Sequence, residues 1–491
     1  MGKLEKVLPA AVRAAFWLLL AFQAVAYCRI STDDAFIFYR YAANIAAGRG
    51  YVFNAGERVL GTTSPLYTLM LAAAQRLFGW LPGVTLPVLG SLISAASMAV
   101  LALLAARFFT RAGRDHAAML APLVMLAVSL FWTGVGMDVL PALAFGMAAI
   151  ACHQDGRGRG AAALAACAVL ARPDLACVPA LLSLDWLVVQ RRRPDWHGVA
   201  IFAALIAAWL AFSYAYFGTM VPTSVVAKLG QAGTGAWGGR FAFLAQLRDL
   251  WPGHVTVRDA TLVLFVIALP LAVAAGRRYR DFRAGWLVLL WIGAYLVAYG
   301  LLLRPAPYPW YYAPLALGMG IVFTMGLDVL VGRAFARSRT VGVSVAVLAV
   351  GYLGFAGAGQ AARTLHEPRH YKYRFFSEAA AWLNQRAAPG AVVACNEIGV
   401  LGYYYEKGPV LDLLGLVNPE VAVHVSGGDF AWPVTHHEPD YVIFKQPPFP
   451  KLEDLATTPW FLDRYTRVAI FGDGTTKIAL YARNAAATTP R

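Results

Sequence analysis

The chain has 491 residues, of which 59% are hydrophobic and only 14% are charged. Ordinary soluble domains carry roughly 45–50% apolar and about 25% charged residues. The composition therefore excludes a soluble enzyme, a disordered chain and a disulfide scaffold, and it indicates a protein that crosses a membrane several times. The net charge of +15 does not indicate nucleic-acid binding, because the arginines cluster in short loops between apolar runs, as they do where they orient a membrane protein.

Eleven apolar runs are candidates for membrane helices, since a helix that spans the bilayer needs roughly 20 mostly apolar residues. Two of them are short and meet at Arg172-Pro173-Asp174. We expect broken helices that meet in a cavity there, because polar backbone at this depth must be covered by protein or water. The eleven runs are 9–28, 85–106, 117–133, 137–153, 160–171, 174–189, 198–217, 260–276, 284–303, 311–332 and 340–360.

The segment 64–79 decides the topology. If it lies against the membrane without crossing it, eighteen basic residues in six short segments fall on one side, against Arg172 and Arg304 in the short turns opposite. The positive-inside rule favours this arrangement. It predicts a multi-pass protein of the bacterial inner membrane with a cytoplasmic N-terminus and no cleavable signal peptide. The loops 29–84 and 218–259 and the tail then face the extracytoplasmic side.

The tail differs from the rest of the chain, because charged residues and prolines return after about residue 360. A helix pattern over Phe376–Arg386 precedes five β-type runs separated by Gly, Pro and Asp, which is typical of a small α/β domain. We therefore predict a mainly α, polytopic membrane helix bundle over 1–360 and a C-terminal extracytoplasmic α/β domain over 361–491. The expected strands are Ala391–Cys395, Val410–Leu413, Tyr441–Phe444, Arg467–Phe471 and Lys477–Tyr481.

Polar residues that could take part in catalysis are most concentrated in the loop Ser31–Leu66. Thr32 is a suitable N-cap, and Asp33 and Asp34 fall in the first turn of a helix expected to reach about Ala47. Two acidic residues at a helix start commonly compensate the helix dipole. Two adjacent carboxylates at the outer membrane boundary can instead serve as a general base and a substrate-orienting partner.

This loop resembles the first extracytoplasmic loop of GT-C superfamily glycosyltransferases, and specifically of the AftB-like group of terminal arabinofuranosyltransferases. The similarity lies in the pattern D-D-A-F-I-x-x-R-Y-A-x-N, followed by G-x-G-x-V-F-N-x-G-E-R-V-x-G-T-T-S-P-L. Weaker similarities follow in family order at Leu170–Asp174, at Phe217–Thr223 with Lys228, and at Glu397–Tyr404 with Asp412–Leu416.

Four positions depart from the pattern of this group, and they leave the sugar and the acceptor open. Leu60 stands where relatives often carry an acidic residue, and Thr62 stands where an aromatic residue is common. Thr223 replaces a common Asn, and Leu175 replaces a usual Gly.

The resemblance implies a GT-C fold and a polyprenyl-phosphate sugar donor whose lipid enters sideways from the bilayer. An acceptor hydroxyl then approaches from the aqueous side and loses its proton to an aspartate at the head of the first loop. Asp33 is the expected base and Asp34 its partner, although the order could be reversed. Some superfamily members use a divalent metal beside the acidic pair. No other residues here have the pattern of metal ligands, so no cofactor is expected, with a divalent metal as the alternative.

Positive charge is needed for the phosphate that leaves. Arg172 is a candidate, and the alternative is an intramolecular pair with Asp174. Lys228 is the second candidate, and its alternative is a solvated loop lysine. Arg172, Asp174 and Lys228 are therefore expected at the donor or acceptor.

Four further residues are candidates for binding. Arg40 and Asn44 fall close to the helix face of Asp33 and are expected to brace it, the alternative being that they form a solvated helix face. The aromatic run 304–312, which includes Tyr311, can belong to an interfacial aromatic belt or form a wall of the sugar pocket. Glu397 in the tail can reach the site or cap a turn.

We therefore expect an inverting-type or related membrane glycosyltransferase with no nucleic-acid partner. The expected sugar is D-arabinofuranose, and a mannose-type hexose is the alternative. The acceptor can be an extracytoplasmic glycan or a glycoprotein. The competing function, from another class of protein, is a transporter or flippase of lipid-linked sugars. Transporters place ionisable residues near the middle of the membrane, whereas most of the polar residues of this chain lie in the loops.

Overall fold

The structure is a computed structural model that describes residues 3–30, 32–236, 241–249, 269, 271, 273, 276–303, 305–474 and 476–484. The helix expected over 260–276 lies almost entirely outside the described residues, as do Ser31 and Arg304. The other ten apolar runs all form helices.

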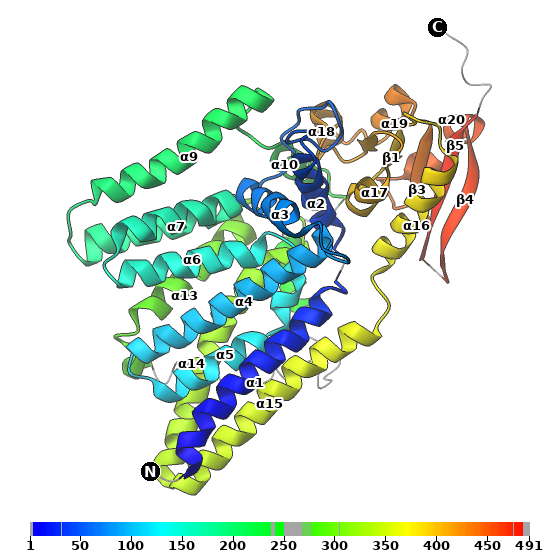
Figure 1. The fold of residues 1–491 in the computed structure, drawn as a ribbon. Helices are drawn as coiled ribbons and strands as arrows, with labels where there is room; N and C mark the ends of the chain where they lie inside the picture. The colour runs from blue at the N-terminus through cyan, green and yellow to red at the C-terminus, as the bar shows by residue number, and fades with distance from the viewer. Residues whose placement is uncertain are drawn as a thin grey trace.

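A bundle of apolar helices forms the larger part of the molecule (Figure 1). Within the described residues, six helices are long and apolar enough to cross a membrane, and three shorter apolar helices accompany them. In most of these helices the hydrophobic side chains are distributed around all faces, as expected for helices surrounded by lipid and by other helices. The helices of the bundle are α1 (Lys3–Tyr27), α4 (Leu86–Arg111), α5 (Asp115–Ala127), α6 (Val139–Gln154), α7 (Gly158–Ala171), α8 (Cys177–Leu184), α9 (Trp196–Phe217), α13 (Arg283–Val297), α14 (Ala313–Arg337) and α15 (Arg339–His366).

The predicted break between two short helices is present. α7 ends at Ala171, and Arg172 adopts an extended conformation with φ −155° and ψ 120°. A residue before proline avoids the helical region, and proline has no N–H to continue the helix. A 3₁₀ turn over Pro173–Ala176 then leads into α8. The break places Arg172 and Asp174 in a cavity inside the protein.

Four helices from the loops 29–84 and 218–259 lie next to the bundle. The first is α2 (Asp33–Ala46), which begins after Thr32 as expected, although the Thr32 side chain makes no capping hydrogen bond. The segment 64–79 forms α3 (Pro65–Phe78), which is not among the helices that could span the membrane. The others are α10 (Thr223–Gly233) and α11 (Ala242–Asp249). Figure 1 shows α2 and α10 between the bundle and the C-terminal sheet.

The tail forms a five-stranded sheet in the order β2-β1-β3-β5-β4, with helices around it. Strands β2, β1 and β3 are parallel, and β3, β5 and β4 are antiparallel. All five predicted strands are confirmed, with ends that differ by up to two residues. The strands are β1 (Val393–Cys395), β2 (Val410–Asp412), β3 (Tyr441–Gln446), β4 (Tyr465–Asp473) and β5 (Thr476–Arg483), and the helices are α16 (Tyr371–Arg386), α17 (Ile398–Tyr404), α18 (Pro419–Ser426), α19 (Trp432–His437) and α20 (Pro459–Arg464).

Candidate functional site

Two cavities meet beside the start of α2. The interdomain cavity, of about 660 Å³, lies between α2, α10 and the tail. The bundle cavity, of about 360 Å³, lies between α2, α10 and the break at Arg172. Among the described residues, five line both cavities, and they are Asp34, Ile37, Lys228, Trp310 and Leu416. Only Asp34 and Lys228 of these five are charged. This pair therefore stands where the cavities join.

Asp34 and Lys228 form an ion pair across 194 positions of sequence. The Lys228 ammonium lies 3.4 Å from the Asp34 carboxylate, and the two side chains keep 26% and 20% of their surface exposed. Burial alone would lower the pKa of Lys228, but Tyr311 and Asp34 raise it above its ordinary value. Lys228 is thus a cation at neutral pH, and both groups remain accessible from the cavities.

An aromatic wall surrounds the Lys228 ammonium. The ammonium lies 5.1 Å from the ring centre of Tyr308, 5.6 Å from that of Trp310 and 5.9 Å from that of Tyr311. These distances are within the range of cation–π attraction. Tyr311 thus lines the bundle cavity, where the sequence placed it in a possible sugar pocket. Tyr308 and Trp310 belong to the same aromatic run, for which a wall of the sugar pocket was one of the two expected roles.

Asp33 faces the tail, in contrast to its neighbour. Its carboxylate accepts hydrogen bonds from the backbone N–H of Gly399, at 3.0 Å, and of Val400, at 2.9 Å. Only 6% of the residue is exposed, although it contributes to the wall of the interdomain cavity. Burial and, to a smaller extent, the nearby Glu397 carboxylate raise its pKa to about 7, against the opposing effects of Lys372 and the Val400 N–H.

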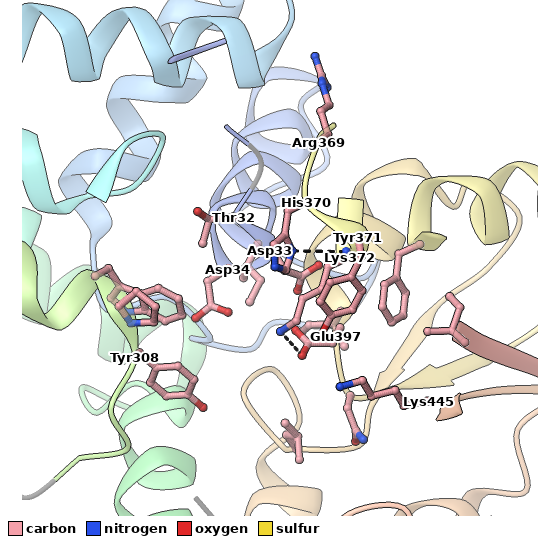
Figure 2. A pocket seen from close by; sticks show the side chains of 18 of the residues that line it. Thr32, Asp33, Asp34, Tyr308, Arg369, His370, Tyr371, Lys372, Glu397 and Lys445 are labelled. Carbon is pink, nitrogen blue, oxygen red and sulfur yellow. Dashed lines mark hydrogen bonds and ion pairs between the residues drawn. The ribbon is translucent and has the colours of Figure 1, made fainter. Parts of the chain in front are cut away.

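Glu397 comes from the tail and lines the interdomain cavity with Asp33 and Asp34. Its carboxylate forms an ion pair with the ammonium of Lys372. Figure 2 shows Asp33 on the side of Lys372 and Glu397, and Asp34 on the side of Tyr308. Sequence reasoning missed Lys372, which lies in an unremarkable amphipathic helix and gave no signal.

Arg172 is held by two carboxylates in the bundle cavity. Its Nε donates to Asp174 at 3.0 Å, and its Nη1 donates to Asp138 at 3.1 Å. The Tyr299 hydroxyl also donates to Asp174, at 2.6 Å, and Ser64 donates to Asp138. The intramolecular pair was one of the two expected roles of Arg172. Since two carboxylates already face the guanidinium, a third anion gains little from it, and the donor-phosphate role is not supported.

Arg40 and Asn44 do not brace Asp33, and this expectation was wrong. Arg40 donates to the backbone oxygens of Phe53, at 2.8 Å, and of Tyr405, at 3.1 Å. Asn44 donates to Val52, at 2.7 Å, and to Phe53, at 3.0 Å. The reason is that unpaired carbonyl groups of the folded loop and of α17 lie on this face of α2. Neither side chain lines either of the two cavities.

Within the described part of the chain, no group of three or more His, Cys, Asp or Glu side chains has the spacing of a metal site. The acidic residues at the centre instead have nitrogen partners. The site as described is therefore a cation, an accessible carboxylate and an aromatic wall between two cavities.

Comparisons with known proteins show what the chain resembles. Residues 363–487 match the model of a domain of unknown function, DUF8728. The terminal β-(1→2)-arabinofuranosyltransferase of Mycobacterium tuberculosis is 31% identical over 252 residues, which are 44% of this chain and 39% of that protein. The enzyme of the same name from Corynebacterium glutamicum is 27% identical over 282 residues, 50% of this chain and 40% of that protein. The matched part is thus well under half of each relative.

Two crystal structures of ArnT from Cupriavidus metallidurans resemble the whole chain. The structure bound to undecaprenyl phosphate has a TM-score of 0.58 and 15% identity, and covers 98% of this chain and 99% of ArnT. The apo structure has a TM-score of 0.56 and 14% identity, with the same coverage. The expected GT-C fold and the resemblance to the AftB-like group are confirmed, and the chain is a multi-pass membrane protein.

Proposed function

We propose that the protein is a membrane glycosyltransferase that moves a sugar from a polyprenyl-phosphate donor to an extracytoplasmic acceptor. The observation that carries the proposal is the Asp34–Lys228 pair, which lies where the two cavities join. The names of the relatives and the undecaprenyl phosphate bound to ArnT support the reaction class and the kind of lipid.

The bundle cavity suits the lipid donor. Its wall includes Leu229 and Leu303, which keep 55% and 48% of their surface exposed. Exposed leucines at this level can contact a polyprenyl chain or acyl chains, while Lys228 lies at the polar end of the same cavity. An ammonium pairs well with phosphate oxygens, and transfer from a phosphate leaving group depends on such positive charge.

The interdomain cavity then receives the acceptor hydroxyl. The hydroxyl oxygen forms a bond to the anomeric carbon of the sugar, and the bond from that carbon to the phosphate oxygen breaks. The hydroxyl proton passes to the Asp34 carboxylate, and the polyprenyl phosphate leaves with the electron pair beside Lys228. A single displacement of this kind inverts the anomeric configuration.

Asp34 fits the role of base better than Asp33, which is the reverse of the first expectation from the sequence. A pKa of about 7 would suit Asp33 as a base. However, each of its oxygens already accepts a backbone N–H, and its side chain faces the tail. Asp34 borders both cavities, and its ion-pair partner is the cation that would move to the donor phosphate.

The proposed sugar is D-arabinofuranose, because both curated relatives are named for its transfer. The test uses purified protein in lipid nanodiscs with radiolabelled decaprenyl-phosphate arabinofuranose or a mannosyl polyprenyl phosphate, and a surface glycan as acceptor. We expect label in the glycan from the arabinosyl donor. Transfer from the mannosyl donor alone would make the protein a hexosyltransferase. Movement of either lipid across liposomes without transfer would favour a flippase.

Lys228→Met is expected to raise the apparent KM for the lipid donor by about 10- to 150-fold. A hydrogen bond to a charged group contributes roughly 1.5–3 kcal/mol, and this loss weakens donor binding by that factor. Lys228→Arg should retain part of the affinity. Lys407→Met, at an exposed position of the tail, is the matched control. An unchanged donor KM in Lys228→Met would remove the lysine from the donor site.

The tail is expected to be extracytoplasmic. If the segment 64–79 crossed the membrane, fifteen of the eighteen basic residues, in five of the six segments, would face outward, against the positive-inside rule. An alkaline phosphatase fused to the C-terminus should be active, while a fluorescent protein exported unfolded through the same route should stay dark. The opposite pattern would mean that the segment 64–79 crosses the membrane and that the assignment of the loops is wrong.

A further inference from the structure

Helix α17 of the tail is held at both ends by side chains of α2. Asp33 accepts hydrogen bonds from the N–H groups of Gly399 and Val400, in the first turn of α17. Arg40 donates to the carbonyl oxygens of Gly402 and Tyr405, at the other end of α17. Asp33 and Arg40 are seven residues apart, which is about two helical turns, so they lie on one face of α2.

The two contacts match the electrical polarity of a helix. The first N–H groups and the last carbonyl groups of a helix have no partners inside it, and they carry partial positive and negative charge. Asp33 places a carboxylate at the positive end of α17, and Arg40 places a guanidinium at the negative end. A single pair of side chains therefore satisfies four backbone groups of the tail.

Close packing supports the same contact. A Cβ atom on Gly399 would lie 1.9 Å from the backbone oxygen of Asp33, so only glycine allows this approach. A Cβ atom on Gly402 would lie 2.6 Å from the ring of Phe53. The α17 backbone thus rests directly on the first loop.

The loop after α2 extends the contact to the sheet. The Asn54 side chain accepts from the Val410 N–H at 3.1 Å and donates to the Val410 carbonyl oxygen at 3.0 Å. Val410 begins β2, one of the two edge strands of the sheet. The side-chain amide of Asn54 therefore pairs with the backbone of β2 much as a neighbouring strand would. The contact between the first loop and the tail thus extends from α17 to the sheet.

We infer that α2 acts as a clamp that fixes the tail on the reaction centre, with Asp33 and Arg40 as positioning residues. Glu397 directly precedes α17 and lines the interdomain cavity opposite Asp34. The clamp sets the place of Glu397 and hence the shape of the acceptor side. The inference that this affects the acceptor rests on the proposed function, whereas the docking of the tail does not.

The test compares Asp33→Asn and Arg40→Met with the wild type by amide hydrogen exchange and by kinetics. Arg40 lines neither cavity, so its loss removes no catalytic group. Both variants should speed exchange at Gly399 and Val400 at least tenfold and raise the acceptor KM at least tenfold. Donor binding, measured with polyprenyl phosphate alone, should stay unchanged. Arg58→Met is the matched control. It removes an arginine of the same loop whose guanidinium lies 4.7 Å over the ring of Tyr216 in α9 and not on α17.

Unchanged exchange in both variants would overturn the clamp, even if the protein transferred no sugar at all. Unchanged exchange and acceptor KM in Arg40→Met, with turnover abolished in Asp33→Asn, would make Asp33 catalytic. If Arg40→Met does not fold, Arg40→Lys keeps the charge with one nitrogen in place of three. That variant should show an intermediate rise in exchange, and wild-type exchange in it would contradict the inference.

Discussion

Asp34→Asn is expected to lower the turnover number by about a hundred- to ten-thousand-fold, while donor binding and the docking of the tail persist. The change is nearly isosteric and leaves an oxygen at the same place, but an amide does not take a proton from the acceptor hydroxyl. Loss of a general base raises the barrier by roughly 2.7–5.4 kcal/mol. Turnover of labelled donor by purified variants measures the effect.

Asp33→Asn is the matched control for this prediction, because it makes the same chemical change one residue away. The effect of Asp33→Asn on turnover should largely disappear at saturating acceptor, since the role of Asp33 is to hold α17. If Asp33 served only to compensate the dipole of α2, it would contribute only about 0.3–1 kcal/mol to the stability of that helix. Near-normal turnover in Asp34→Asn, with Asp33→Asn inactive at saturating acceptor, would restore the order that the sequence first suggested.

Arg172→Met is expected to lower the free energy of unfolding by about 3–5 kcal/mol. The substitution leaves the carboxylates of Asp138 and Asp174 buried near each other without their cation. Breaking a buried ion pair from one side carries a cost of this size, because the remaining charge is uncompensated. Thermal unfolding in detergent measures it.

The triple variant Arg172→Met, Asp138→Asn and Asp174→Asn provides the control, because it also removes the unpaired charges. It should recover much of the stability. A wild-type melting temperature in Arg172→Met together with a raised donor KM would show that Arg172 serves the donor phosphate instead of the fold.

The elements of the fold could be predicted because they depend on local signals. Long apolar runs indicate membrane helices by themselves, and Pro173 marks the break after Arg172 through its own stereochemistry. The five strands of the tail alternate with Gly, Pro and Asp, which end strands wherever they occur. None of these features needs a partner far away in the chain.

The roles of Asp33 and Asp34 could not be separated in this way. The two residues are adjacent and identical, and their roles differ only in partners that lie 366 and 194 residues away. The same limit explains the error on Arg40. Its spacing from Asp33 correctly predicted a shared face, but the occupant of that face is α17 of the tail. Asp138 gave a weak signal as a charge within an apolar run, yet its partner Arg172 could not be named.

A structure of the protein with bound polyprenyl phosphate tests the central claim most directly. The account predicts the phosphate in the bundle cavity, with an oxygen within roughly 3 Å of the Lys228 ammonium, as in charge-assisted hydrogen bonds, and the lipid chain passing Leu303. Asp34 should then face the free side of the phosphate from the junction with the interdomain cavity. A phosphate bound at Arg172, or in the interdomain cavity beside Glu397, would contradict it.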